Sequence, residues 1–213
     1  MGRCRILSRA LTVLVLMTAA EVQAGQPVPD GYARVAAAHG VPAEALYAVS
    51  LSESSRTLSR GARPWPWTLN VAGKGYRYNS RIEAWRALQG FMKHHSLRRI
   101  DVGLAQVNLG WNGHHFTSTW EAFEPYTNLN AAATILRECW MRRPGSWLDA
   151  AGCYHHPAGG AAAARYRSIV RGNLAKITPP RPSDLQTAAS PQAVALLTPA
   201  PGVVQSGTGR PPR

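Results

Sequence analysis

The spacing of hydrophobic residues predicts a domain built mainly from α-helices. After Pro42, which suits the first turn of a helix, Ala45, Leu46 and Val49 recur at helical spacing. Further helices are predicted from Ser80 to about His95, from Asn128 to Arg142, from Gly145 to about Tyr154, and from Gly160 to Lys176. Gly145 and Ser146 together mark the restart after Arg142. The pattern therefore indicates several helices of ordinary length within one domain.

One segment between the first two helices has the pattern of strands. Residues 67–71 and 75–78 are expected to pair around Ala72, Gly73 and Lys74 as a small β-hairpin. The following Ser80 and Glu83 form a capping-box pattern that starts a helix. Residues 101–111 show no clear helical or strand period. We therefore expect a mainly α (α+β) fold with a single small hairpin.

The first 24 residues have the composition of an export signal. Arg3, Arg5 and Arg9 precede an uncharged, mostly apolar run, and Val22–Gln23–Ala24 fits a cleavage site. The run is shorter than the roughly 20 residues that span a bilayer, and no later stretch is long and apolar enough to span one. Residues 1–24 are thus a predicted signal peptide of a periplasmic or secreted protein; the alternative is an uncleaved N-terminal anchor.

The end of the chain differs in composition from its middle. All aromatic residues lie between Tyr32 and Tyr166, whereas residues 178–213 contain eight prolines and no aromatic residue. Such a segment buries too little apolar surface to fold, so a disordered tail is predicted. The folded domain is expected to cover residues 25–177.

Charge and cysteine content narrow the possible partners and the compartment. A formal net charge of +13 favours an anionic partner: nucleic acid, a membrane surface or an acidic polymer. Export argues against nucleic acid, and a cell-wall polymer that carries peptide carboxylates fits better. Outside the signal only Cys139 and Cys153 remain, and an oxidising compartment favours a disulfide between them, with two buried thiols as the alternative.

Glu53 is the candidate for acid chemistry. It shares a helical stripe with Leu46 and Val49, so its carboxyl group is expected at the edge of a core. An apolar surrounding and the negative end of the helix dipole would both raise its pKa. A carboxylic acid that stays protonated near neutral pH can protonate the leaving oxygen of a glycosidic bond. The alternative is a solvent-facing glutamate at a helix end.

Two further stretches contain groups suited to binding sugars. Gly103, Gln106 and Asn108 place amides on a loop, where they can meet hydroxyl and N-acetyl groups. Tyr154 follows a predicted helix, where its hydroxyl could orient an acid. Seven tryptophans add flat rings that suit sugar faces. Each feature alone also fits an ordinary turn or core.

The order of these motifs resembles the soluble lytic transglycosylases. The matching residues are Glu53-Ser54, the sequence GLAQVN from Gly103 to Asn108, and Tyr154 within GCYHHP. The sequence PWPWTLNVAG, residues 64–73, is similar to smaller members associated with conjugation and secretion systems. The resemblance implies a goose-type lysozyme-like domain that acts on peptidoglycan glycan strands without a cofactor, with conjugation or secretion machinery as a possible partner.

The resemblance also implies a role for each matching residue. Glu53 would be the lone catalytic acid and then the base, so that cleavage gives a 1,6-anhydro sugar. Gln106 and Asn108 would line the saccharide groove, and Tyr154 would hold Glu53 and the substrate. Ser54, placed with the substrate-binding residues, would give a local hydrogen bond rather than act as a nucleophile.

The chain departs from the family pattern at two places. Ala105 stands where methionine is usual, and His155, His156 and Pro157 stand where Asn-Ala-Gly is common. His155 is expected to replace the amide as a hydrogen-bonding group. The pairs His94–His95, His114–His115 and His155–His156 also raise the alternative of a zinc site, but adjacent histidines on a helix point in different directions, so no metal is predicted.

Three other functions compete with the transglycosylase. A hydrolase of lysozyme type needs a second carboxylate or a positioned water, and Asp101 is the candidate near the motifs, although a turn cap is its simpler role. A wall-binding scaffold with an inactive site is the second alternative. A nucleic-acid binder rests on charge alone and is not predicted.

Overall fold

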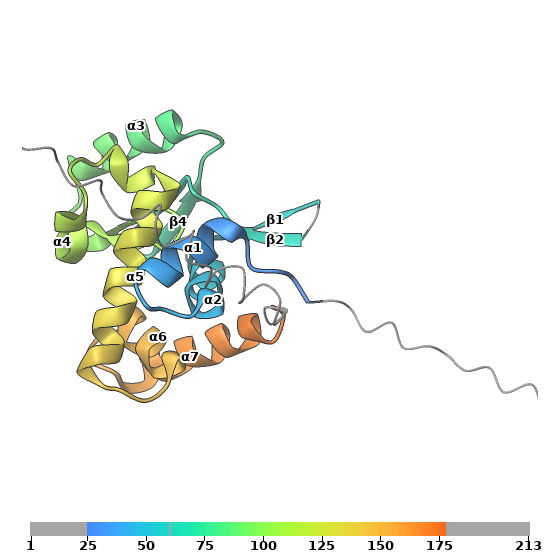
Figure 1. Cartoon of the computed structure of the whole chain (residues 1–213). Helices are drawn as coiled ribbons and strands as arrows, with labels where there is room; N and C mark the ends of the chain where they lie inside the picture. Colours follow the sequence, from blue (N-terminus) through green and yellow to red (C-terminus); the bar gives the residue numbers. More distant parts are fainter. Residues whose placement is uncertain (1–24, 60, 178–213) are drawn as a thin grey trace, which may run out of the picture.

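Helices predominate in the computed structural model, which also has two small antiparallel sheets; the β1–β2 hairpin projects away from the helices (Figure 1). The structure describes residues 25–59 and 61–177, so the predicted signal peptide and Pro-rich tail lie outside it. The helices are α1 (Asp30–Ala38), α2 (Ala43–Ser54), α3 (Arg81–Met92), α4 (Leu109–Asn112), α5 (Pro125–Arg142), α6 (Trp147–His155) and α7 (Gly160–Leu174), with short 3₁₀ turns at Leu97–Arg99, Gly113–His115 and Glu121–Phe123. The strands are β1 (Ser55–Leu58), β2 (Gly61–Pro64), β3 (Thr68–Val71), β4 (Lys74–Arg77), β5 (Ile100–Val102) and β6 (Val107–Asn108). The expectation of a helical fold with small strands is confirmed.

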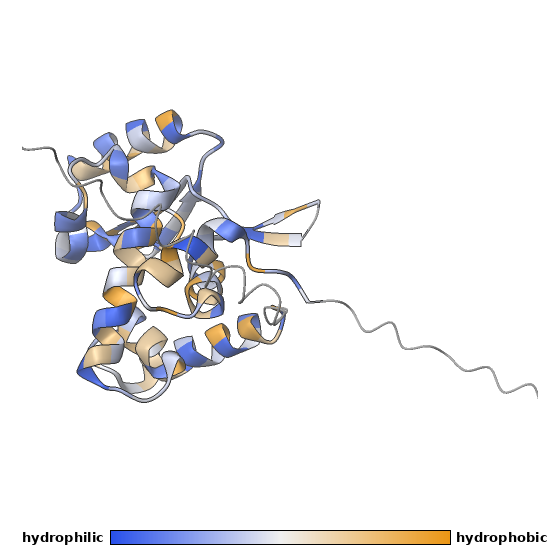
Figure 2. Ribbon diagram, in the orientation of Figure 1, coloured by the Kyte–Doolittle hydropathy of each residue, from blue (hydrophilic) through white to orange (hydrophobic). Residues whose placement is uncertain are grey.

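Helix α2 is the centre of the helical part of the molecule. Residues 45–51 are all buried, so this helix has no polar face over that length. It packs against α1, α5, α6 and α7, and Figure 2 shows it as predominantly hydrophobic. A helix that is apolar all round belongs inside a core, not on its surface. Glu53 is therefore carried to the core edge by a fully enclosed helix rather than by one apolar stripe.

The four-stranded sheet forms a second, smaller core. Its strand order is β4-β3-β5-β6, with antiparallel pairing throughout. Leu69, Val102 and Leu88 are fully buried between this sheet and α3. The predicted hairpin is confirmed as β3–β4, where Ala72 and Gly73 turn the chain at φ values of 54° and 88°. Lys74 begins β4 instead of lying in the turn.

The start predicted for the helix that ends at Arg142 is wrong. α5 begins at Pro125, and the side chain of Glu124 caps it by accepting a hydrogen bond from the Thr127 amide at 2.6 Å. Proline suits the first helical position because it has no N–H to leave unpaired. Asn128 lies one turn inside the helix and is completely buried. Its amide is used for contacts with other segments, described below.

The other predicted helix starts agree with the structure. Ser80 accepts from the Glu83 amide at the start of α3, Ser146 accepts from the Asp149 amide at the start of α6, and α7 begins at Gly160. Four strands were not predicted: β1 and β2, which form a hairpin directly after α2, and the short strands β5 and β6. β5 and β6 have three and two residues, too few to show a hydrophobic period.

A disulfide ties α5 to α6. The sulfur atoms of Cys139 and Cys153 are bonded, with 5.7 Å between the Cα atoms. Cys153 directly precedes Tyr154 and His155, so the bond anchors the end of α6 that carries these side chains. Among residues 25–59 and 61–177, no helix has both the length and the apolar character needed to span a bilayer.

Candidate active site

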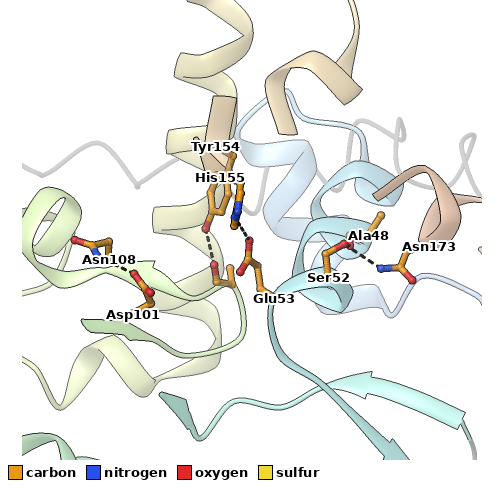
Figure 3. Close-up of polar contacts among 9 residues, drawn as sticks. Ala48, Ser52, Glu53, Asp101, Asn108, Tyr154, His155 and Asn173 are labelled. Atoms are coloured by element: carbon orange, nitrogen blue, oxygen red, sulfur yellow. Dashed lines mark hydrogen bonds and ion pairs between the residues drawn. The ribbon is translucent and has the colours of Figure 1, made fainter. Parts of the chain in front are cut away.

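A cleft of about 770 Å³ lies between the helical part and the four-stranded sheet. We call its two sides the helical wall, from α2, α5 and α6, and the sheet wall, from β3, β5, β6, α4 and the turn at residues 103–106. The helical wall presents Glu53, Ile135, Glu138, Tyr154 and His155, and the sheet wall presents Asn70, Asp101, Gln106, Asn108 and Trp111. Figure 3 shows Glu53 between Asp101 and Asn108 on one side and Ser52 on the other, with Tyr154 and His155 above it.

Glu53 occupies the last turn of α2, where the helix leaves the core. Its side chain is 14% exposed, enough to reach a ligand in the cleft. The next residue, Ser54, is fully buried and does not line the cleft. The Ser54 hydroxyl donates to the Leu104 carbonyl at 2.6 Å and accepts from the Trp65 amide at 3.2 Å. The placement of Ser54 with substrate-binding residues is therefore corrected, whereas a local supporting role agrees with these bonds.

His155 is the closest charged partner of Glu53. Its Nδ1 atom lies 3.8 Å from Oε1 of Glu53, and its side chain is 45% exposed. The imidazole stacks on the ring of Tyr166, with 4.3 Å between centroids and 3° between planes. The nearby Glu53 carboxylate raises the pKa of His155, burial opposes this, and the charge of Asp101 adds to the rise. His155 is therefore protonated more readily beside Glu53 than a free histidine side chain would be.

Tyr154 supports the cleft in a different way from the one predicted. Its hydroxyl donates to the Ala105 carbonyl at 2.7 Å, and the single phenolic proton cannot also serve Glu53 (Figure 3). Burial raises the pKa of Tyr154, and the charges of Glu53 and Asp101 raise it further. The residue therefore remains a neutral donor that fixes the turn at Ala105 against the helical wall. The expectation that it holds Glu53 directly is corrected.

The turn between β5 and β6 shapes the sheet wall. Gln106 adopts a φ of 48°, a region that residues other than glycine seldom occupy. Its side-chain amide donates to the carbonyls of Thr68 and Gly103. Backbone strain of this kind concentrates at functional sites. These bonds use the side-chain donors of Gln106, so its side-chain oxygen is the group left to accept a hydrogen bond from a ligand in the cleft that Gln106 lines.

Asn128 holds this turn against α5. Its side-chain oxygen accepts from the Ala105 amide, and its amide donates to the carbonyls of Val102 and Ala122, all at 3.0 Å. A Cβ atom at Gly103 would lie 2.3 Å from the Asn128 nitrogen, so only glycine fits there. The glycine expected to start a binding loop is required by a buried asparagine as well as by its φ of 83°.

Asn108 lines the cleft as predicted, but its side chain is already fully engaged. Its oxygen accepts from the amides of Gly110 and Trp111, and its nitrogen donates to the Arg98 carbonyl and to Asp101 at 2.8 Å. An amide with these four bonds has little capacity left for a sugar. Asn108 therefore positions its neighbours rather than serving as a free binding group.

Asp101 is a second carboxylate in the cleft. It lies within β5, so the simpler role of turn cap does not apply. Burial raises the pKa of Asp101 to about 6, opposed by the hydrogen bond from Asn108 and assisted by the negative charge of Glu53. Two carboxyl groups that influence each other across a cleft are a frequent feature of active sites.

Trp111 lines the cleft, although the sequence pattern did not single it out among the seven tryptophans. It is 62% exposed although it lies in the cleft, and the guanidinium of Arg98 lies 4.3 Å from its ring centroid. Bonds from Asn108 to the backbone fix the start of α4 on which it stands. One ring face is thus backed by a cation while the residue remains open to a ligand. Only its position after the Asn108 cap hinted at this arrangement.

The described residues contain no group of three or more His, Cys, Asp or Glu side chains that could hold a metal ion. His155 pairs with Glu53, and His114 contacts His115 with 4.2 Å between tilted rings.

Comparison of the chain with models of protein families, with curated proteins and with solved structures gives no match. The function is therefore argued from the residues of the cleft and from the motif resemblance.

Proposed function

We propose that the chain is a peptidoglycan lytic transglycosylase with a goose-type lysozyme-like fold. The observation that carries this proposal is the position of Glu53: a carboxyl group at the end of an enclosed helix, 14% exposed, at an open cleft with amides and an exposed tryptophan on the opposite wall. A glycan strand needs such an elongated, mixed polar and aromatic surface together with one proton donor.

Glu53 acts twice in the proposed reaction. The carboxyl group first protonates the oxygen that links N-acetylmuramic acid to N-acetylglucosamine, and the bond to the anomeric carbon breaks. The carboxylate then takes the proton from the C6 hydroxyl of the muramic residue, whose oxygen bonds to the anomeric carbon. The product is a 1,6-anhydro sugar, no water is consumed, and Glu53 regains its proton.

His155 supplies a source for the first proton. The imidazole Nδ1 and the Glu53 carboxylate lie 3.8 Å apart, and in the proposed mechanism they share one proton. A saccharide that fills the cleft removes water from this pair, and a drier surrounding favours its neutral form, with the proton on Glu53. His155 then becomes a neutral acceptor that can bond a sugar hydroxyl. This role replaces the amide that the family pattern has at this place.

The proposed location and partners follow from the predicted signal peptide and the motif resemblance. A periplasmic or secreted enzyme meets the wall directly, and the motif at residues 64–73 favours local wall opening for a conjugation or secretion assembly. The substrate is the glycan strand, and neither a cofactor nor nucleic acid has a role.

Product analysis tests the reaction type. Purified sacculi digested with the mature protein should yield muropeptides with anhydro ends, measured by mass spectrometry. Digestion in H₂¹⁸O should leave these ends unlabelled, because water does not enter the product. Reducing ends that carry ¹⁸O would contradict the proposal.

A lysozyme-type hydrolase is the second candidate, favoured by one observation. Asp101 lies in the same cleft as Glu53 and is electrostatically coupled to it, so the structure offers a second carboxylate that could hold a water. A pKa of about 6 leaves Asp101 ionised at neutral pH, as a general base must be. The ¹⁸O experiment separates the two enzymes, and Asp101→Asn would abolish activity only in the hydrolase.

A further inference from the structure

A second, smaller pocket adjoins the cleft behind the disulfide. Its volume is about 300 Å³, and it shares Cys139, Arg142, Cys153, His156 and Pro157 with the lining of the main cleft. A ligand in the main cleft therefore lies next to this pocket. We call it the arginine pocket, because Arg142, Arg143 and Arg167 line it together with one carboxylate, that of Asp149.

The charge of this pocket is only partly neutralised. Arg142 lies 3.4 Å from Glu138, and both side chains are about half exposed. Arg143 forms no ion pair in the described part of the chain. Exposed ion pairs contribute little and exchange readily, so a competing anion can take over these guanidinium groups. The pocket thus has more positive charge than its own carboxylates satisfy.

Arg167 is positioned by a carboxylate and by the surface of α6. Its Nη1 atom lies 3.6 Å from Asp149, and Asp149 is itself held by the Ser146 hydroxyl at 2.6 Å. Its aliphatic stem lies over Gly152 of α6, where an added Cβ atom would be 3.0 Å from Cγ of Arg167. Glycine inside a helix costs about 0.5–1 kcal/mol relative to alanine, so its presence is explained by the room that the Arg167 stem needs. Asp149, which also lines the pocket, therefore keeps the Arg167 guanidinium at the pocket wall.

We propose that the arginine pocket binds a carboxylate of the peptide that branches from a glycan strand lying in the main cleft. The choice of this ligand rests on the proposed function, because wall glycans carry short acidic peptides beside the bond that is cleaved. Planar guanidinium groups bind carboxylates through two parallel hydrogen bonds, which lysine cannot provide. The pocket selects strands that keep their peptides.

A binding experiment tests this site without requiring catalysis. The probe is a free tetrapeptide of stem-peptide composition, compared by calorimetry with the same peptide amidated at its carboxylates. The wild-type protein should bind the acid form at least about tenfold more tightly, and added salt should reduce the difference. Equal binding of the two peptides, or binding of neither, would overturn the proposal.

Variants locate the contact. Arg143→Ala and the double variant Arg143→Ala/Arg167→Ala should weaken binding of the acid peptide, the double variant by about tenfold or more. Arg171→Ala is the matched control, because Arg171 lies one turn from Arg167 on α7 but does not line the pocket. Thermal unfolding shows whether each variant is folded, and Arg143→Ala alters only an exposed helix end. Wild-type affinity in both pocket variants would exclude the site.

Cleavage assays separate failure of the pocket from failure of the enzyme. The double variant should cleave peptide-bearing strands about tenfold more slowly than wild type and strands stripped of peptides at an unchanged rate. Equal slowing on both strands would contradict peptide binding, although the enzyme would stand. Peptide binding through the arginines in a protein that cleaves neither strand would refute the enzyme and leave the pocket.

Discussion

The two walls of the cleft are built in opposite ways. The helical wall rests on long helices around the enclosed α2, tied together by the Cys139–Cys153 bond. The sheet wall rests on strands of two to four residues and on side-chain bonds from Asn108 and Asn128. The helical wall presents the acid Glu53 with its partner His155, whereas the sheet wall presents amides, Asp101 and Trp111.

In the proposed enzyme, this difference would separate chemistry from binding. Long packed elements would hold Glu53 where a small displacement would lower the rate, because a proton transfer requires hydrogen-bond distance. The sheet wall instead contains locally unfavourable features: the left-handed Gln106 and the half-buried carboxyl of Asp101. Such features persist only where the surrounding bonds enforce them, which is typical of ligand-contacting regions. Four substitutions test this division.

Removal of the acid should have the largest effect. Glu53→Gln should lower the rate of glycan cleavage by about 10³-fold, because the amide cannot donate the proton. Binding of labelled glycan strands should remain, since the sheet wall is intact. Glu44→Gln, in the first turn of the same helix, serves as the control and should keep full activity. If Glu53→Gln cleared sacculi at the wild-type rate, the chemistry would belong to another group.

Asn128→Ala should destabilise the protein by about 3 kcal/mol. The change leaves the Ala105 amide and the carbonyls of Val102 and Ala122 without their buried partner. Urea unfolding measures the effect. Asn130→Ala on the exposed face of the same helix is the matched control, with an expected loss below about 1 kcal/mol. Equal losses in both variants would show that the sheet wall does not depend on Asn128.

Asp101→Asn should stabilise the protein at neutral pH by about 2 kcal/mol, after allowance for its partial exposure. The folded-state pKa of Asp101 is about 6 against 3.8 for the free side chain, so the folded protein binds this proton more tightly. The free energy of unfolding should therefore fall as pH rises from about 4 to about 6, and the cost persists above that range.

The raised pKa of His155 also makes the free energy of unfolding fall as pH rises, but in a higher pH range. Its stabilising contribution is complete below the ordinary value of 6.5 and is lost as pH rises through the folded-state pKa. Unfolding curves measured from pH 3 to pH 9 separate Asp101 from His155, because the Asp101→Asn variant should lack only the fall in stability at the lower pH. If the free energy of unfolding of Asp101→Asn still fell between pH 4 and pH 6, the carboxyl group of Asp101 would not be the cause of that fall.

Trp111→Ala should have the smallest effect, confined to binding. The glycan affinity should fall by about tenfold through loss of a stacking surface, while the stability changes little because the ring is exposed. Fluorescence titration with a chitin-type oligosaccharide measures the affinity. Tyr126→Ala, an exposed aromatic outside the cleft, provides the comparison. Unchanged affinity in Trp111→Ala would remove the sheet wall's aromatic platform from the proposal.

Local patterns were sufficient for much of the fold. The caps at Ser80 and Ser146, the turn at Gly73 and the helical spacing in α2 depend on residues within a few positions of one another, so the amino-acid sequence alone determines them. The pairing of Cys139 with Cys153 needed only two cysteines and helices of the right length.

Tertiary structure decided the rest, because the relevant partners are far apart in the chain. Asparagine often caps a helix, but Asn128 is buried one turn inside α5, because Glu124 and Pro125 form the start of the helix. The backbone carbonyls of Val102 and Ala122 then bond the Asn128 side chain. The short strands β5 and β6 form only by pairing, and they turn Asp101 into a cleft carboxylate. The sequence alone singled out Glu53 as the candidate acid; only packing could bring His155 to it across about a hundred residues, because no local pattern encodes that contact.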